Sequence, residues 1–299
     1  MANWLISIEG TLQGRHVALG LALLAAILHA LFGALQKGRH DPWLTRAAID
    51  ICYGLMALPF ALFVVPWPEP HMWAIFAGAW VIHSVYKVLQ AMTYTRGAYT
   101  VVYPVVRGTG PLFTVLVAGV VFAEHYQPLQ WFGVGLLTSG IFGLALYNMR
   151  NLTLERDTLI SALGFAVLTG ALVAAYTTYD AWGIRATANP FTFLAWFFLI
   201  DCFTMPLISL KRLRATAGPD LIPLFKRGLL GAFVAFFSFG SIMLATRLDR
   251  VGEAAVLRET STVFAALIGW LLLKEKVGLA RALLMGLIAL GAVVMEMAG

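Results

Sequence analysis

Ionisable side chains within apolar segments are the residues of this sequence best placed to do chemistry. His83 and Lys87 stand four residues apart and therefore share one face of a helix. Gln90 continues that face, and Tyr86 is adjacent to it. Ionisable groups in the middle of a long apolar segment are rare and mostly functional. We therefore expect Lys87 to attract a carboxylate or another anionic group, and His83 to line the same cavity.

A structural ion pair is the alternative interpretation of Lys87. Its own segment offers no acidic neighbour, so a buried lysine there needs a partner from another part of the chain. Asp50, Asp201 and Glu259 are the candidates, and a pair with any of them would neutralise the ammonium group.

Two arginines extend the set of candidate substrate-binding residues. Segment 103–124 places Arg107 beside glycines and prolines, a combination typical of a broken helix at a solute site. The planar guanidinium groups of Arg107 and Arg258 suit a carboxylate or a phosphate. Glu259 follows Arg258 and would either neutralise it or titrate and couple a proton to transport. Tyr103 is a further candidate for the cavity wall.

The remaining acidic residues and His29 are candidates for charge pairing or proton coupling. Asp50 and Asp201 lie inside apolar segments, where either could receive an amine or a proton. Asp180 lies near the end of its segment, so we expect a solvated position at the membrane surface. His29, deep in the first apolar segment, is expected to be a hydrogen-bonded core histidine rather than a proton carrier.

The composition indicates that membrane-spanning helices hold these side chains. Of the 299 residues, 60% are hydrophobic and 12% are charged, and the mean hydropathy is +0.82. A soluble domain is closer to half apolar and a quarter charged, and a span needs about 20 apolar residues. We therefore expect an all-α polytopic membrane protein. Ten segments qualify as spans: 16–36, 42–65, 71–94, 98–122, 128–148, 158–182, 190–210, 224–246, 252–273 and 277–297.

The two halves of the chain resemble each other. A shift of 151 residues relates Arg107 to Arg258 (258 − 107 = 151) and Asp50 to Asp201 (201 − 50 = 151). The sequence therefore predicts two repeats, 14–149 and 156–298, of five spans each. Because five is odd, the repeats would enter the membrane in opposite senses, as in secondary transporters that bind substrate between inverted repeats around a central cavity.

Basic residues suggest an orientation. Most of the lysine and arginine outside the spans lies in the connections 1–2, 3–4, 5–6, 7–8 and 9–10. We assign Arg46 to these connections. Basic loops favour the cytoplasm, so both termini are expected outside. We expect a multi-pass protein of the cell inner (plasma) membrane. Because such loops also explain the net charge of +6, no nucleic-acid partner is implied.

Two runs of the chain resemble the EamA-type branch of the drug/metabolite transporter superfamily. They are YPVVRGTGPLFTVLVAGVVFAE and VLRETSTVFAALIGWLLLKEKVG. In both, a helix ends at a glutamate and a Gly-rich helix follows. The second copy departs from the first by having Thr262 in place of Pro111, which puts a matched helix break in doubt. The resemblance implies ten helices in an inverted repeat, and export of small metabolites, often amino acids, by alternating access. Some relatives have cytoplasmic termini, which disagrees with the orientation that the basic loops suggest.

These observations favour a secondary transporter, with a small polar or zwitterionic metabolite as its partner and protons as a further one. Proton-coupled efflux of cationic drugs and a non-transporting membrane receptor or scaffold are the alternatives. The sequence has no GxSxG, HExxH, P-loop or CxxC motif, so we expect no enzymatic activity, catalytic residue, metal or cofactor. The resemblance implies that a monomer, or a weak dimer, acts in the bilayer.

Overall fold

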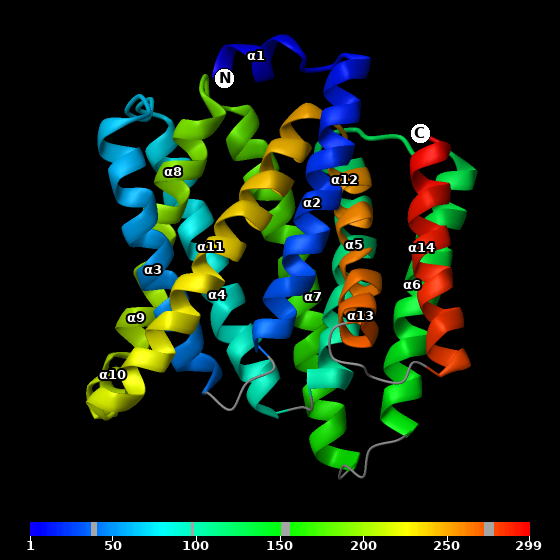
Figure 1. The fold of residues 1–299 in the computed structure, drawn as a ribbon. Coiled ribbons are helices and arrows are strands. Elements are labelled where there is room, and N and C mark those ends of the chain that lie inside the picture. Colours follow the sequence, from blue (N-terminus) through cyan, green and yellow to red (C-terminus); the bar gives the residue numbers. More distant parts are fainter. Residues whose placement is uncertain (37–40, 97–98, 151–155, 272–277) are drawn as a thin grey trace.

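The structure is a computed structural model that describes residues 1–36, 41–96, 99–150, 156–271 and 278–299. Every regular element within these ranges is an α-helix (Figure 1). The helices are α1 (Ala2–Ser7), α2 (Leu12–Gln36), α3 (Pro42–Phe63), α4 (Met72–Arg96), α5 (Tyr99–Val121), α6 (Pro128–Arg150), α7 (Arg156–Arg185), α8 (Pro190–Asp201), α9 (Thr204–Ile208), α10 (Leu210–Ala215), α11 (Gly218–Leu248), α12 (Val251–Arg258), α13 (Ser261–Leu271) and α14 (Leu279–Met297).

The long helices have the length and composition of membrane spans. Within the described ranges, nine segments are long and apolar enough to cross a bilayer, and they coincide with nine of the ten expected spans. Large apolar side chains such as Phe63, Val120 and Leu283 point outward, with 83%, 84% and 62% of their surface exposed. Such outward faces suit lipid, and helices satisfy their own backbone groups there. The chain is therefore a polytopic α-helical membrane protein, as predicted.

The helix break lies in the second half of the chain and not in the first. The fourth span, α5, is continuous although it contains Pro104 and Pro111, so the predicted break at these prolines is wrong. The expected span 252–273 is instead divided between α12 and α13, at Glu259 and Thr260. There the backbone bonds have the tighter three-residue spacing, and the Thr260 hydroxyl donates to a carbonyl three residues earlier at 2.7 Å. Hydroxyl side chains that bond the preceding turn compete with the helical pattern.

Eight helices of the described part of the chain form a ring around the middle of the bundle. α11 packs against α2 and α3, α8 against α3 and α4, and α7 against α4 and α5. α12 closes the ring between α2 and α5 (Figure 1). This arrangement turns one face of α2, α3, α4, α7, α8, α11 and α12 toward a common interior.

Glycines hold α6 and α14 together at the edge of the bundle. A Cβ atom on Gly133 would lie 2.7 Å from the carbonyl oxygen of Gly291, and one on Gly291 would lie 2.5 Å from the amide nitrogen of Leu137. The two glycine-containing helices are thus in close contact at these positions. Small residues are the usual means of such backbone approach in membranes.

Both termini lie at the same end of the bundle (Figure 1), and polar contacts join its helices there. Glu124 accepts hydrogen bonds from the backbone N–H groups of Val251 and Gly252 at 2.7 and 3.1 Å, at the start of α12. Arg247 in α11 binds Glu9, which precedes α2, at 2.5 Å. Contacts between helices of both halves therefore bind this terminal end of the bundle together.

Candidate substrate site

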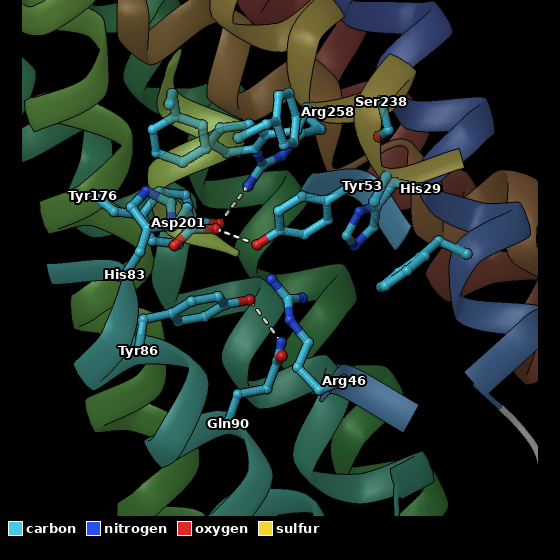
Figure 2. A pocket seen from close by; sticks show the side chains of 15 residues that line it. His29, Arg46, Tyr53, His83, Tyr86, Gln90, Tyr176, Asp201, Ser238 and Arg258 are labelled. Atoms are coloured by element: carbon cyan, nitrogen blue, oxygen red, sulfur yellow. Dashed lines mark hydrogen bonds between the residues drawn. The ribbon is translucent and has the colours of Figure 1, made fainter. Parts of the chain in front are cut away.

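A cavity of about 90 Å³ lies between the helices that face the interior, and Figure 2 shows the side chains around it. Its wall combines aromatic rings with ionisable groups, as small-molecule sites commonly do. The lining residues are His29 and Phe32 of α2, Arg46 and Tyr53 of α3, His83, Tyr86 and Gln90 of α4, Tyr176 of α7, Phe197, Phe198 and Asp201 of α8, Ala235, Ser238 and Phe239 of α11, and Arg258 of α12.

Lys87 lies beside this cavity in a network of ion pairs. Its ammonium nitrogen is 2.6 Å from Oδ2 of Asp50 and 2.8 Å from Oδ2 of Asp201, and its side chain is fully buried. It also donates to the Tyr53 hydroxyl at 2.8 Å and to the Asp201 carbonyl at 2.7 Å. Lys87 thus has four acceptors, and its ion pairs with Asp50 and Asp201 are those of the alternative, structural interpretation. It is not among the residues that line the cavity.

Arg46 completes the network. Its predicted position in a loop is wrong. Its Nε lies 2.9 Å from Oδ1 of Asp50, one turn away in α3. Arg46 was expected in the connection before α3, but the Asp41 side chain caps α3, and the helix therefore includes Arg46. The cations Arg46 and Lys87 thus balance the carboxylates Asp50 and Asp201.

Arg107 and Glu259 form a second buried pair. Nε of Arg107 lies 2.8 Å from Oε2 of Glu259, and an Arg107 NH2 group donates to the Ser261 hydroxyl at 3.2 Å. The Arg107 guanidinium also lies 5.9 Å from the centre of the Tyr103 ring. The three predicted candidates Tyr103, Arg107 and Glu259 are therefore together, but they are not among the lining residues of the cavity.

Arg258 differs from the other buried cations. It is the last residue of α12, it is 5% exposed, and it lines the cavity. An NH2 group reaches the hydroxyl of Tyr176 at 3.4 Å, whereas Nε has no hydrogen-bond partner. Within the described part of the chain, no carboxylate pairs with it, in contrast to Arg107. Its positive charge is therefore available to a ligand.

His83 and Asp180 form a third polar contact. Nε2 of His83 lies 2.7 Å from Oδ2 of Asp180, and Asp180 is 1% exposed. The predicted solvated position of Asp180 at the membrane surface is therefore wrong. α7 continues to Arg185, which places Asp180 more than a turn inside the helix end, against α4.

Aromatic rings form much of the cavity wall, and most of them were not predicted from the sequence. The rings of Phe197 and Phe239 stack with centres 5.1 Å apart, and His83 lies 4.8 Å from Phe197. Among the predicted residues, Tyr86 accepts from Gln90 at 2.6 Å, and His29 contributes its ring from α2. α8 is apolar around its whole circumference, so its sequence gave no signal for which phenylalanines face inward.

Comparisons with known proteins agree with this architecture. A family model described as the EamA-like transporter family matches residues 160–297. A solved structure titled "Crystal structure of protein" is similar over 94% of this chain and 96% of its own, with a TM-score of 0.73 and 16% sequence identity. At that identity the likeness concerns the fold alone. No curated protein sequence matches the chain.

Proposed function

Because residues 160–297 belong to the EamA-like transporter family of the drug/metabolite transporter superfamily, we propose that the chain is a secondary transporter that exports small zwitterionic metabolites, such as amino acids, by alternating access. The family makes the chain a membrane transporter. The class of substrate follows from the site.

One observation carries the proposed substrate class. Nε of Arg258 and Oδ1 of Asp201 are buried atoms of opposite charge without hydrogen-bond partners, and both residues line the same cavity. An unpaired buried donor or acceptor costs free energy, which a ligand can recover by binding it. A zwitterion satisfies both at once, with its carboxylate at Arg258 and its ammonium at Asp201.

Arg258, and not Lys87, is the proposed carboxylate site. Lys87 is neutralised by Asp50 and Asp201, and Arg107 is neutralised by Glu259. Neither cation is therefore available to a ligand. Asp201 keeps Oδ1 for the ligand because Lys87 and Tyr53 both contact Oδ2. Each charged contact with the ligand contributes about 1.5–3 kcal/mol.

Related helix contacts support two inverted repeats. The shift of 151 residues maps α4 and α7 onto α11 and α2, and both pairs of helices pack against each other. It also maps the contact of α5 with α7 onto that of α12 and α13 with α2. We propose that the terminal end, bound by Glu124 at the start of α12, is the closed side of the cavity, and that export alternates it with the opposite end.

The distribution of charge supports an orientation in which both termini lie on the outer side of the inner membrane, opposite the cytoplasm. At the terminal end, basic residues have acidic partners, as Arg250 does with Glu253 at 2.9 Å. At the opposite end, α10 carries an exposed basic cluster of Lys211, Arg212 and Arg214, although Arg212 also contacts Asp41. Exposed basic segments favour the cytoplasmic side.

Matched ligands test the proposed substrate class. The zwitterions are L-alanine, L-leucine and L-phenylalanine. Their deaminated analogues are propionate, 4-methylpentanoate and 3-phenylpropionate, and their decarboxylated analogues are ethylamine, 3-methylbutylamine and 2-phenylethylamine. Isothermal titration calorimetry of the purified protein measures binding. We expect at least one amino acid to bind about 10- to 100-fold more tightly than either analogue, because each analogue lacks one charged contact.

Two variants make the binding test specific to the cavity. Arg258→Gln should abolish the advantage of the amino acid over its amine. Arg150→Gln, which removes an exposed arginine at the end of α6, should not change binding. Binding of the amines in preference to the amino acids would instead favour cationic drug efflux. If no compound of the panel binds or is transported in proteoliposomes, the proposed substrate class is wrong.

A further inference from the structure

Asp180 lies close to two basic side chains, His83 and Arg258. Its Oδ2 contacts His83 at 2.7 Å, while its Oδ1 has no hydrogen-bond partner. A second cavity of about 10 Å³ is lined by both Asp180 and Arg258, and this volume holds about one water molecule. Asp180 and Arg258, each with a buried polar atom that lacks a hydrogen-bond partner, therefore line the same small space.

The other carboxylates around His83 each have a cation as partner, although Oδ1 of Asp201 has no hydrogen bond. From α3 and α8, Asp50 and Asp201 face Lys87 of α4, and Arg46 adds a second cation to this network. From α5 and the end of α12, Arg107 and Glu259 neutralise each other. The groups that contact His83 directly from α7, α8 and α11 are, apart from Asp180, the rings of Tyr176, Phe197 and Phe239.

This leaves one carboxylate, Asp180, for two basic side chains, His83 and Arg258. With the cavity empty and His83 neutral, Asp180 is, within the described residues, a carboxylate beside Arg258 that no other cation contacts. When a ligand carboxylate binds Arg258, the ligand neutralises the charge of this arginine. Asp180 can then pair with a protonated His83 imidazole. Buried charges in a membrane protein need such compensation.

We propose that Asp180 is a counter-ion shared by His83 and Arg258, so that a carboxylate bound at Arg258 makes His83 take up one proton. With Asp180 ionised, Nε2–H of His83 donates to Oδ2. The proton comes from the aqueous phase and forms a bond with Nδ1, which gives an imidazolium. No other bond forms or breaks, and the ligand carboxylate and the proton enter the site as a neutral pair. Asp180 acts here as a positioning residue, and the inference rests on the proposed function because it needs a carboxylate at Arg258.

Calorimetry in buffers of different ionisation enthalpy measures the protons taken up per bound ligand. The probe is 4-methylpentanoate, with propionate and 3-phenylpropionate beside it, near pH 7, where histidine titrates. We expect uptake of up to one proton and an affinity that rises as the pH falls, because the complex holds more protons than the free protein. L-Leucine should take up fewer, since its ammonium supplies a positive charge.

The variants distinguish coupling from a structural role. His83→Gln should bind the acids with no proton uptake and with an affinity that does not change between about pH 6 and 8. Asp180→Asn should also lose uptake while it keeps at least the original affinity, and Asp180→Glu should restore uptake. His125→Gln, which removes an exposed histidine after α5, is the matched control and should behave as the original chain does.

The outcomes of these titrations separate the two proposals. Equal proton uptake in the original chain and in folded His83→Gln or Asp180→Asn protein would overturn the coupling alone. Binding of the acids without any proton uptake would do the same. If none of the acids or amino acids binds, the proposed function is overturned, and the coupling is overturned with it.

Discussion

The ammonium group of Lys87 lies 2.6 Å from the carboxylate of Asp50 on the neighbouring span, in a fully buried contact. With Asp201 at 2.8 Å on its other side, Lys87 joins α4 to α3 and α8. The most conspicuous charge in the sequence is therefore a cation that holds helices together, and the charge available to a ligand belongs to Arg258.

Removal of Lys87 should destabilise the protein. Lys87→Met leaves Asp201 buried without its cation, and breaking a buried pair in this way costs about 3–5 kcal/mol. The free energy of unfolding, measured by titration with a denaturing detergent, should fall by this amount. Lys87→Met combined with Asp201→Asn should recover part of the loss. If Lys87→Met keeps full stability and loses only ligand binding, Lys87 belongs to the substrate site after all.

The two arginines related by the repeat should respond in opposite ways. Arg107→Gln leaves Glu259 buried and unpaired, so its free energy of unfolding should fall by about 3 kcal/mol or more. Arg258→Gln removes a buried cation without an ion-pair partner, so stability should be kept or increased. The same unfolding titration compares the two variants. Equal destabilisation of both would show that Arg258 is also a structural cation.

The sequence predicted the helical fold and the identity of many buried ionisable groups, because apolar segment length and rare charges are local signals. It did not predict their pairing. Whether Lys87 or Arg258 keeps a free charge depends on distances between helices such as α3, α4 and α8, and a single sequence does not contain them. The burial of Asp180 was missed because α7 continues beyond the apolar segment 158–182.

The helix break shows the same limit. Pro111 is a strong breaker of helices in general, yet α5 is continuous, and the break follows Arg258 near Thr260. In membranes, neighbouring helices can satisfy the backbone groups that a proline leaves free. Of the two glutamates at the ends of the repeated runs, Glu124 caps α12, and Glu275 lies outside the described residues.

The glycine contact between α6 and α14 gives a matched pair of substitutions. Gly133→Ala places a methyl group 2.7 Å from the carbonyl of Gly291, so the helices must move apart and the unfolding temperature should fall. Gly135→Ala, two residues away on the exposed face, meets no atom within 4 Å and should raise helix stability by up to about 1 kcal/mol. Thermal unfolding followed by tryptophan fluorescence compares them. Equal effects would contradict the proposed packing.

Glu69, in the connection between α3 and α4, should make stability depend on acid pH. Burial acts to raise the pKa of Glu69, but hydrogen bonds from the Ala188 N–H and the Thr187 hydroxyl outweigh it and lower the pKa below the ordinary 4.5. A lowered pKa means that the charged form stabilises the fold above the unfolded-state pKa, and that this is lost as the pH falls through the folded-state pKa. Glu69→Gln should therefore lower the unfolding temperature near pH 7, and the difference from the original chain should shrink as the pH falls below about 4. A difference that does not change with pH would contradict this account.

Counterflow in proteoliposomes tests the central claim most directly. Vesicles loaded with the best-binding amino acid of the panel should accumulate the radiolabelled compound when they contain the original chain or Arg150→Gln, and should fail to do so when they contain folded Arg258→Gln. Full counterflow by Arg258→Gln would contradict the assignment of Arg258 as the group that receives the substrate carboxylate.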